Sequence, residues 1–297
     1  GFKPVSRETA ILLGNVLLLA ALATVLLGTL YPLVLDAFDL GKVSIGPPYF
    51  NTVFVPMMAP VLLLLGIAPR LRWGHNRLAT VLGGARWEAL AALVLAGTAP
   101  LAFGEFRWQA VLGLGLGGWM VLTTVGSLVT RWREAGFLSL SAFGMGCAHA
   151  GLAIGIIGMG LVSAYQSERT VAMRPGDTAT LGAYTFVFKG ATEVPASNYS
   201  AMRASLELAR DGKTLGLLEP EKRLYRSSRT TMTEAAIRYG FLGDVYVALG
   251  EPLPGGAWSV QLYVKPFVGW LWAGALFMFA GGVLAALGAR RPSEMKA

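Results

Sequence analysis

Charged residues, cysteine and histidine are all scarce in this chain of 297 residues. Only 14% of the residues are charged, and 54% are hydrophobic. The single cysteine, Cys147, cannot form an internal disulfide, and the absence of a Cys-x-x-Cys-His sequence means that the chain is not itself a c-type cytochrome. There are two histidines, His75 and His149. The polar block 165–265 has no histidine and no Gly-x-Ser-x-Gly motif, so no hydrolytic site is expected there and no catalytic residue is identified.

The hydrophobic residues form runs of about 20, long enough to cross ~30 Å of hydrocarbon as helices. This pattern is typical of a polytopic membrane protein. We expect residues 1–164 to form helices one to five with short loops, residues 165–265 a water-facing β-rich domain, and residues 266–297 the last helix and a tail. The six predicted spans are Thr9–Leu35, Phe50–Pro69, Trp87–Phe103, Trp108–Thr130, Phe137–Ala164 and Phe267–Ala289.

The net charge of +8 would also suit a nucleic-acid-binding protein, but the basic residues flank the predicted spans and are better explained by membrane topology. Threading six helices alternately places most of them on one side, so both termini are expected to be cytoplasmic and the block 165–265 periplasmic. The opposite short loops hold only Lys42 and Arg107. The cytoplasmic set is Lys3, Arg7, Arg70, Arg72, Arg77, Arg86, Arg131, Arg133, Arg290, Arg291 and Lys296.

The polar block favours β-structure. Its apolar residues alternate with polar ones, and Asp211-Gly212 between two such stretches is a hairpin signal. About six short strands are expected, forming a small sandwich or barrel. The fold class is therefore a polytopic α-helical membrane protein with a β-rich domain inserted before its last helix. The strands named by the pattern are Tyr184–Lys189, Met202–Leu208, Thr214–Leu218, Asp244–Leu249 and Trp258–Val264.

His149 is the candidate functional residue, because it lies alone within the apolar stretch Phe137–Ala164. An ionisable side chain at that depth costs a few kcal/mol by insertion scales and usually has a function. Neutral imidazole is a common ligand of metals and of haem iron. A histidine hydrogen-bonded to a neighbouring helix is the alternative, and burial alone does not separate the two. Cys147 is interpreted as a packing residue, and His75 as a solvated residue of an arginine-rich loop.

Several segments of the sequence resemble the CcmF-type cytochrome c haem lyases, in order and nearly from end to end. The chain begins without an initiator methionine or a signal region, and the resemblance covers the C-terminal half of the family, so we expect it to be part of a longer protein. The segments are Ser6–Glu8, Leu27–Pro32, Ser44–Asn51, His149–Ala153, Glu221–Tyr225, Ser228–Ile237 and Leu262–Phe267.

The resemblance implies a membrane haem lyase of the bacterial inner membrane. Such an enzyme receives haem from a periplasmic haem chaperone and attaches it to the Cys-x-x-Cys-His thiols of apocytochrome c. The resemblance also implies a b-type haem in the membrane that reduces the incoming haem, with quinol as electron donor. His149 would be an axial ligand of its iron, and the partner histidine would come from the N-terminal half. Further expected partners are the thiol-presenting maturation factors and the lipid bilayer. No nucleic acid is expected among the partners.

Two other classes of function stay open. A transporter component would suit a second span that contains Pro56 and Pro60 and a fourth that is rich in glycine. A non-catalytic docking scaffold would use the β-rich domain to hold partners. Neither predicts bound haem, so haem content separates both of them from a haem lyase.

Overall fold

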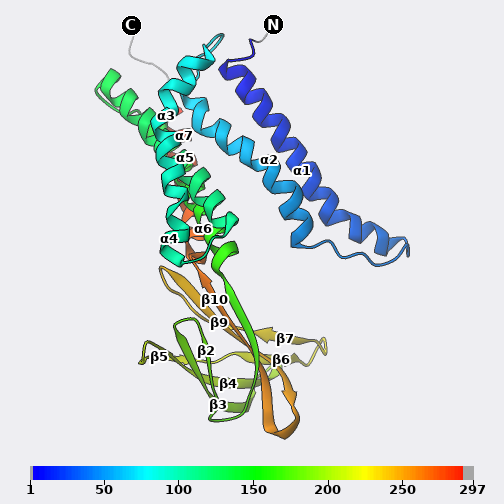
Figure 1. Cartoon of the computed structure of the whole chain (residues 1–297). Coiled ribbons are helices and arrows are strands. Elements are labelled where there is room, and N and C mark those ends of the chain that lie inside the picture. Colours follow the sequence, from blue (N-terminus) through cyan, green and yellow to red (C-terminus); the bar gives the residue numbers. More distant parts are fainter. Residues whose placement is uncertain (1–2, 290–297) are drawn as a thin grey trace. The chain divides into compact units, whose positions relative to one another are not determined.

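The computed structural model of the chain describes residues 3–289, apart from the side chains of residues 99 and 100. Its helices precede and follow a continuous run of β-strands (Figure 1). Two compact units are present, residues 158–272 and residues 1–157 together with 273–297. Arg290, Arg291 and Lys296, which were used above to orient the last span, lie outside the described residues.

Six helical segments of the described chain are long and apolar enough to cross a membrane, which confirms the predicted fold class. Their large apolar side chains are widely exposed, as Leu19 and Leu27 show at 64% and 65%. Such faces fit a lipid environment, because the helix already pairs its own backbone groups. The helices are α1 (Arg7–Ala37), α2 (Pro47–Ile67, continued by the 3₁₀ turn Ala68–Arg70), α3 (Leu78–Ala96), α4 (Thr98–Phe103), α5 (Trp108–Ala135), α6 (Leu140–Tyr165) and α7 (Val268–Ala289).

Local chemistry sets the starts of α1 and α2. The hydroxyl of Ser6 accepts the backbone N–H of Thr9 at 3.2 Å and caps α1. Pro47 begins α2 at a position where its missing N–H would have had no intrahelical partner. The two helices lie side by side (Figure 1), and the Tyr49 hydroxyl donates to the carbonyl of Thr24 at 3.2 Å.

The third span differs from its prediction. It was expected over 87–103, but α3 begins at Leu78 and ends at Ala96, and α4 follows after Gly97. No proline lies between residues 78 and 87, and the glycines at 83 and 84 are accommodated within the helix. The guanidinium of Arg86 lies 5.2 Å from the centroid of the Trp87 ring. Proline is tolerated in the first turn of a helix and not in its interior, so Pro100 fits the start of a new helix at Thr98.

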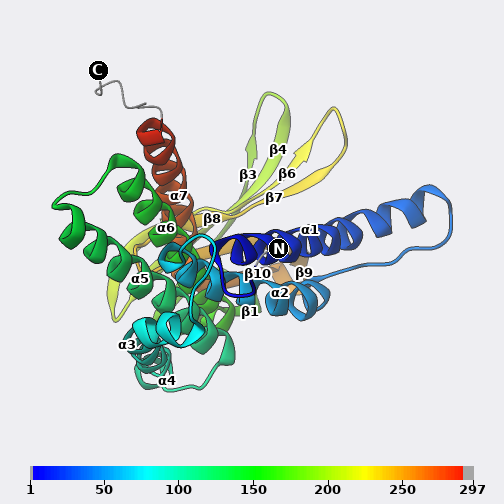
Figure 2. The same ribbon diagram turned by 90° about the horizontal axis from the view of Figure 1, so that it is seen from above.

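Helices α5, α6 and α7 pack through small residues, and Figure 2 shows α3, α5, α6 and α7 following one another in a row. A Cβ atom on Gly151 would lie 2.6 Å from the carbonyl oxygen of Gly274, and one on Gly281 would lie 2.6 Å from that of Gly144. Only glycine permits this approach of two backbones. We call these contacts between α6 and α7 the glycine seam.

The second unit contains a β-sandwich. A four-stranded sheet has the order β1-β10-β9-β8, and a second sheet has the order β2-β3-β4-β6-β7, with β5 paired to β4. All pairs are antiparallel. The strands are β1 (Ser167–Met173), β2 (Thr178–Leu181), β3 (Tyr184–Pro195), β4 (Tyr199–Arg210), β5 (Lys213–Leu218), β6 (Glu221–Tyr225), β7 (Thr231–Glu234), β8 (Ala236–Arg238), β9 (Gly243–Leu253) and β10 (Ala257–Pro266).

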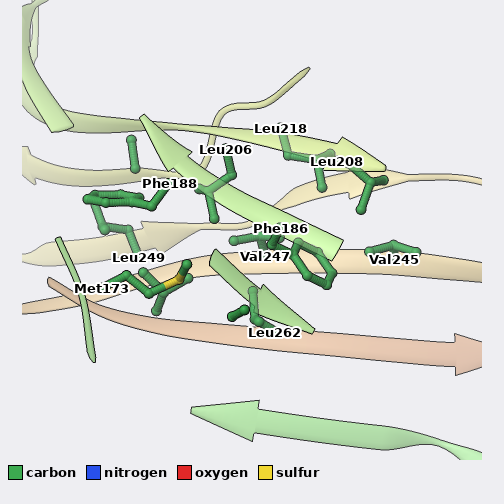
Figure 3. Close-up of a cluster of buried hydrophobic side chains, with 13 residues drawn as sticks. Met173, Phe186, Phe188, Leu206, Leu208, Leu218, Val245, Val247, Leu249 and Leu262 are labelled. Atoms are coloured by element: carbon green, nitrogen blue, oxygen red, sulfur yellow. The ribbon is translucent and has the colours of Figure 1, made fainter. Parts of the chain in front are cut away.

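The sandwich core is formed by alternate residues of both sheets (Figure 3). Phe186, Phe188, Leu206, Leu208 and Leu262 are each 0% exposed. This is the inward-facing alternation of packed sheets. The five strands named from the sequence are present, but the number of strands in the described residues exceeds the six expected. Asp211 and Gly212 both have positive φ, 49° and 77°, as the predicted hairpin requires.

Candidate functional site

His149 lies on α6, which begins after a Ser139 cap whose hydroxyl accepts the backbone N–H of Ala142 at 3.2 Å. His149 lies ten positions after that cap and sixteen positions before Tyr165, where the helix ends. The side chain is partly buried. The helix is among the six that could cross a membrane, so the imidazole lies far from both ends of an apolar segment.

Thr124 of α5 holds the imidazole. Its hydroxyl oxygen lies 3.3 Å from Nδ1 of His149, and Thr124 is only 3% exposed. The carbonyl of Thr124 accepts the hydroxyl of Ser127 at 2.8 Å, which ties the same turn of α5 together. Within residues 3–289, Nε2 of His149 has no hydrogen-bond partner. The arrangement therefore fits a tautomer in which Nδ1–H donates to Thr124 and Nε2 keeps its lone pair.

The face of α6 that carries His149 packs on α5, whereas the glycine seam lies on the other side of α6. A Cβ atom on Gly146 would meet the side chain of Leu128, and one on Gly117 would lie 3.0 Å from the carbonyl oxygen of Ala153. These contacts bring α5 and α6 close together on either side of the histidine. The Thr124 hydroxyl is thereby kept within reach of the ring.

The donors at this site fit haem iron better than a simple metal ion. No group of three or more His, Cys, Asp or Glu residues that could hold an ion is found in the described part of the chain. A structural zinc site needs about four protein ligands. A porphyrin supplies the equatorial ligands itself and takes one axial imidazole from a helix. His149, with Nδ1 held and Nε2 open, has the chemistry of such a ligand.

The other candidates from the sequence are not brought to His149. Cys147 is partly buried two positions earlier on α6, which places it about 200° around the helix from His149. His75 is exposed in the loop between the 3₁₀ turn and α3. Sequence reasoning missed Thr124, although the adjacent polar pair Thr123-Thr124 inside an apolar span was the available signal.

Strand β6 carries two basic residues, Lys222 and Arg223, and both form ion pairs with carboxylates of the sandwich. Glu221 is 6% exposed, and its carboxylate binds Arg203 at 2.6 Å and Arg223 at 2.7 Å. The hydrogen bond from Arg223, with that from Arg203, holds the pKa of the Glu221 carboxyl below its ordinary value. Lys222 pairs with Glu251. These cations stabilise the sandwich, and they do not form an open basic patch.

Comparison with known proteins identifies both parts of the chain. Residues 164–266 match the family model described as the CcmF C-terminal beta-sandwich. The cytochrome c-type biogenesis protein CcmF of Pseudomonas aeruginosa is 43% identical over 100% of this chain and 46% of its own length. The CcmF of Escherichia coli is 42% identical over 94% of this chain and 43% of its own length.

A solved structure titled Cytochrome c Heme Lyase CcmF has the same fold. It superposes with a TM-score of 0.76 at 24% identity, over 95% of this chain and 46% of that one. This chain thus spans less than half the length of the relatives named here. The relatives are bacterial, and the six candidate spans make this a multi-pass bacterial membrane protein. The chain belongs to the CcmF family and corresponds to the C-terminal part of its members, which carries the β-sandwich.

Proposed function

We propose that this chain is part of a membrane haem lyase that attaches haem to the Cys-x-x-Cys-His thiols of apocytochrome c. The observation that carries the proposal is His149, a membrane-embedded imidazole with Nδ1 held by Thr124 and Nε2 open, in a chain of the CcmF family. In this proposal the imidazole of His149 would hold the iron of a b-type haem. The second axial histidine would come from the part of the relatives that this chain does not cover.

The roles of the chain's own residues follow from their geometry. His149 would hold iron through Nε2 as a neutral ligand, which brings no net charge into the lipid. The hydroxyl of Thr124 would accept a hydrogen bond from Nδ1–H and fix the orientation of the ring, as partners of ligating histidines commonly do. The bound haem would supply an electron for reduction of the haem that is to be attached, with quinol as the donor.

The partners proposed for the whole protein follow from the same chemistry. Haem would be delivered by a periplasmic haem chaperone, and apocytochrome c would be presented with reduced thiols by maturation factors. The sandwich, residues 167–266, is proposed to face the periplasm, and both ends of the helical part the cytoplasm. This orientation rests on the basic residues at the loop between α2 and α3 and at the end of α5.

Cysteine labelling tests the orientation. Ser197 is exposed between β3 and β4, so Ser197→Cys offers an accessible thiol. A maleimide that does not cross the inner membrane is expected to label this thiol in cells whose outer membrane is permeabilised and whose inner membrane is intact. Labelling that requires disruption of the inner membrane would contradict the orientation and leave the haem proposal standing.

The test of the haem proposal is the reduced-minus-oxidised visible spectrum of the natural full-length protein, with haem quantified per protein. The His149→Ala variant is expected to lose the b-type signal and most cytochrome c maturation while still entering the membrane. Cys147→Ala, two positions away on α6, is the control and should keep both. A wild-type protein without haem would favour the transporter or the docking scaffold, and a signal unaffected by His149→Ala would remove His149 as a ligand.

A further inference from the structure

A large cavity lies in the first unit, away from His149. Its volume is about 860 Å³, and it is lined by the start of α1, the loop after α2, the first turns of α3 and the last turns of α5. On α5 its lining residues include Gly126, Ser127 and Thr130. These residues lie C-terminal to Thr124 on α5, and neither Thr124 nor His149 lines the cavity.

The cavity is strongly basic. Its lining includes five arginines but only two carboxylates, Glu88 and Glu134. One arginine is neutralised, because Arg70 pairs with Glu88 at 2.6 Å and also donates to the carbonyl of Gly84 at 2.9 Å. The other four have no carboxylate partner among residues 3–289, and one of them, Arg7, lies over the Trp73 ring at 5.1 Å from its centroid. They are Arg7, Arg72, Arg77 and Arg131.

The walls of the cavity are fixed by the backbone. The N–H of Arg7 donates to the carbonyl of Arg72 at 3.2 Å, and the N–H of Asn76 donates to the carbonyl of Val5 at 2.9 Å. The Glu8 carboxylate accepts the N–H of Gly74 at 2.9 Å. The start of α1 and the loop 71–77 are thus joined at several points. The backbone that carries Arg7, Arg72 and Arg77 is therefore in place before a ligand binds, which leaves the side chains as the part to be ordered.

We propose that this cavity binds a phosphate group. Guanidinium groups bind phosphate through paired, charge-assisted hydrogen bonds, and an excess of unpaired arginines around one cavity is the arrangement that such an anion requires. The phosphate can belong to an anionic phospholipid or to a soluble phosphate compound. A lipid source is favoured by the position, since Gly126 and Ser127 lie within a membrane span and the neighbouring Leu78 and Leu82 of α3 are exposed.

Thermal unfolding of the full-length protein in detergent tests the proposal. Added dioleoylphosphatidylglycerol is expected to raise the unfolding midpoint, and dioleoylglycerol, which has the same acyl chains but no phosphate, to raise it less. Arg131→Gln should weaken the apparent affinity for phosphatidylglycerol about five-fold, the equivalent of ~1 kcal/mol for one basic residue near a charged lipid surface. Arg133→Gln is the matched control, because Arg133 is exposed on the same end of α5 but does not line the cavity.

If only phosphatidylglycerol raises the unfolding midpoint, and does so through Arg131, the phosphate belongs to a lipid. If millimolar inorganic phosphate also raises the midpoint through Arg131, the phosphate belongs to a soluble compound. Equal effects of the two lipids, or equal losses in the two variants, would overturn the proposal. Haem content does not enter this test, so its result is independent of the role of His149.

Discussion

Removing the Thr124 hydroxyl tests whether its contact with His149 contributes to haem binding. Thr124→Val keeps the shape of the side chain and deletes the hydroxyl that lies 3.3 Å from Nδ1 of His149. The hydrogen-bond partner of a ligating histidine orients the ring and raises its basicity, and its loss typically lowers affinity about 10- to 100-fold. Haem in the full-length protein should therefore be held about 10- to 100-fold less tightly. Thr124→Ser retains the hydroxyl and should restore most of the affinity.

The assay is transfer of haem from the purified full-length protein to an excess of a haem-scavenging protein, followed in the visible spectrum. Thr123→Val is the matched control. Thr123 is adjacent and 0% exposed, but its hydroxyl donates within its own helix to the carbonyl of Trp119 at 2.7 Å. Equal haem loss from Thr123→Val and Thr124→Val would show that the hydrogen bond to His149 has no special part in holding haem.

Three further predictions concern packing and charge. Gly281→Val should lower the unfolding midpoint of the full-length protein through a clash with α6, at a cost of about 1–3 kcal/mol, whereas Gly282→Val, with open space around it, should not. Phe186→Ala should destabilise the sandwich by about 3–5 kcal/mol in urea denaturation. Glu221 has a lowered pKa when folded, so its stabilising effect is complete above its ordinary pKa of 4.5 and is lost as the pH falls below it. Glu221→Gln should therefore flatten the loss of sandwich stability in acid, measured by circular dichroism.

The sequence predicted the spans well because twenty consecutive apolar residues have few alternatives to a transmembrane helix. The start of α3 was placed too late, since Gly83, Gly84 and Arg86 lower the local hydrophobicity without breaking a helix. The hydrophobicity of a segment shows where the chain can cross a membrane. The ends of a helix can be predicted only where a capping residue or a proline marks them, as Ser6 and Pro47 do.

Strand β6 was not named from the sequence because its pattern is not apolar. Strand β6 reads Glu-Lys-Arg-Leu-Tyr, and its buried residue is Glu221, made tolerable there by two arginines. A pairing of this kind depends on Arg203, eighteen positions away on a neighbouring strand, and cannot be read from β6 alone.

The sequence indicated one residue of the candidate site. His149 was singled out because an isolated histidine in an apolar run is unusual, but its hydrogen-bond partner Thr124 lies 25 positions away on another helix. The arginines of the α2–α3 loop were interpreted only as a topology signal. That they surround a cavity together with Arg7 and Arg131 follows from the packing of α1, α2, α3 and α5.

The glycine seam has a consequence for the order of biosynthesis. Its two helices are separated by the whole sandwich, since α6 ends at Tyr165 and α7 begins at Val268. At about 5–20 residues per second, a ribosome needs roughly 5–20 s to make those hundred residues. During that time the glycine face of α6 would lie in the membrane without α7 packed against it. Longer loops in the sandwich would lengthen this interval and would leave the final contact between α6 and α7 unchanged.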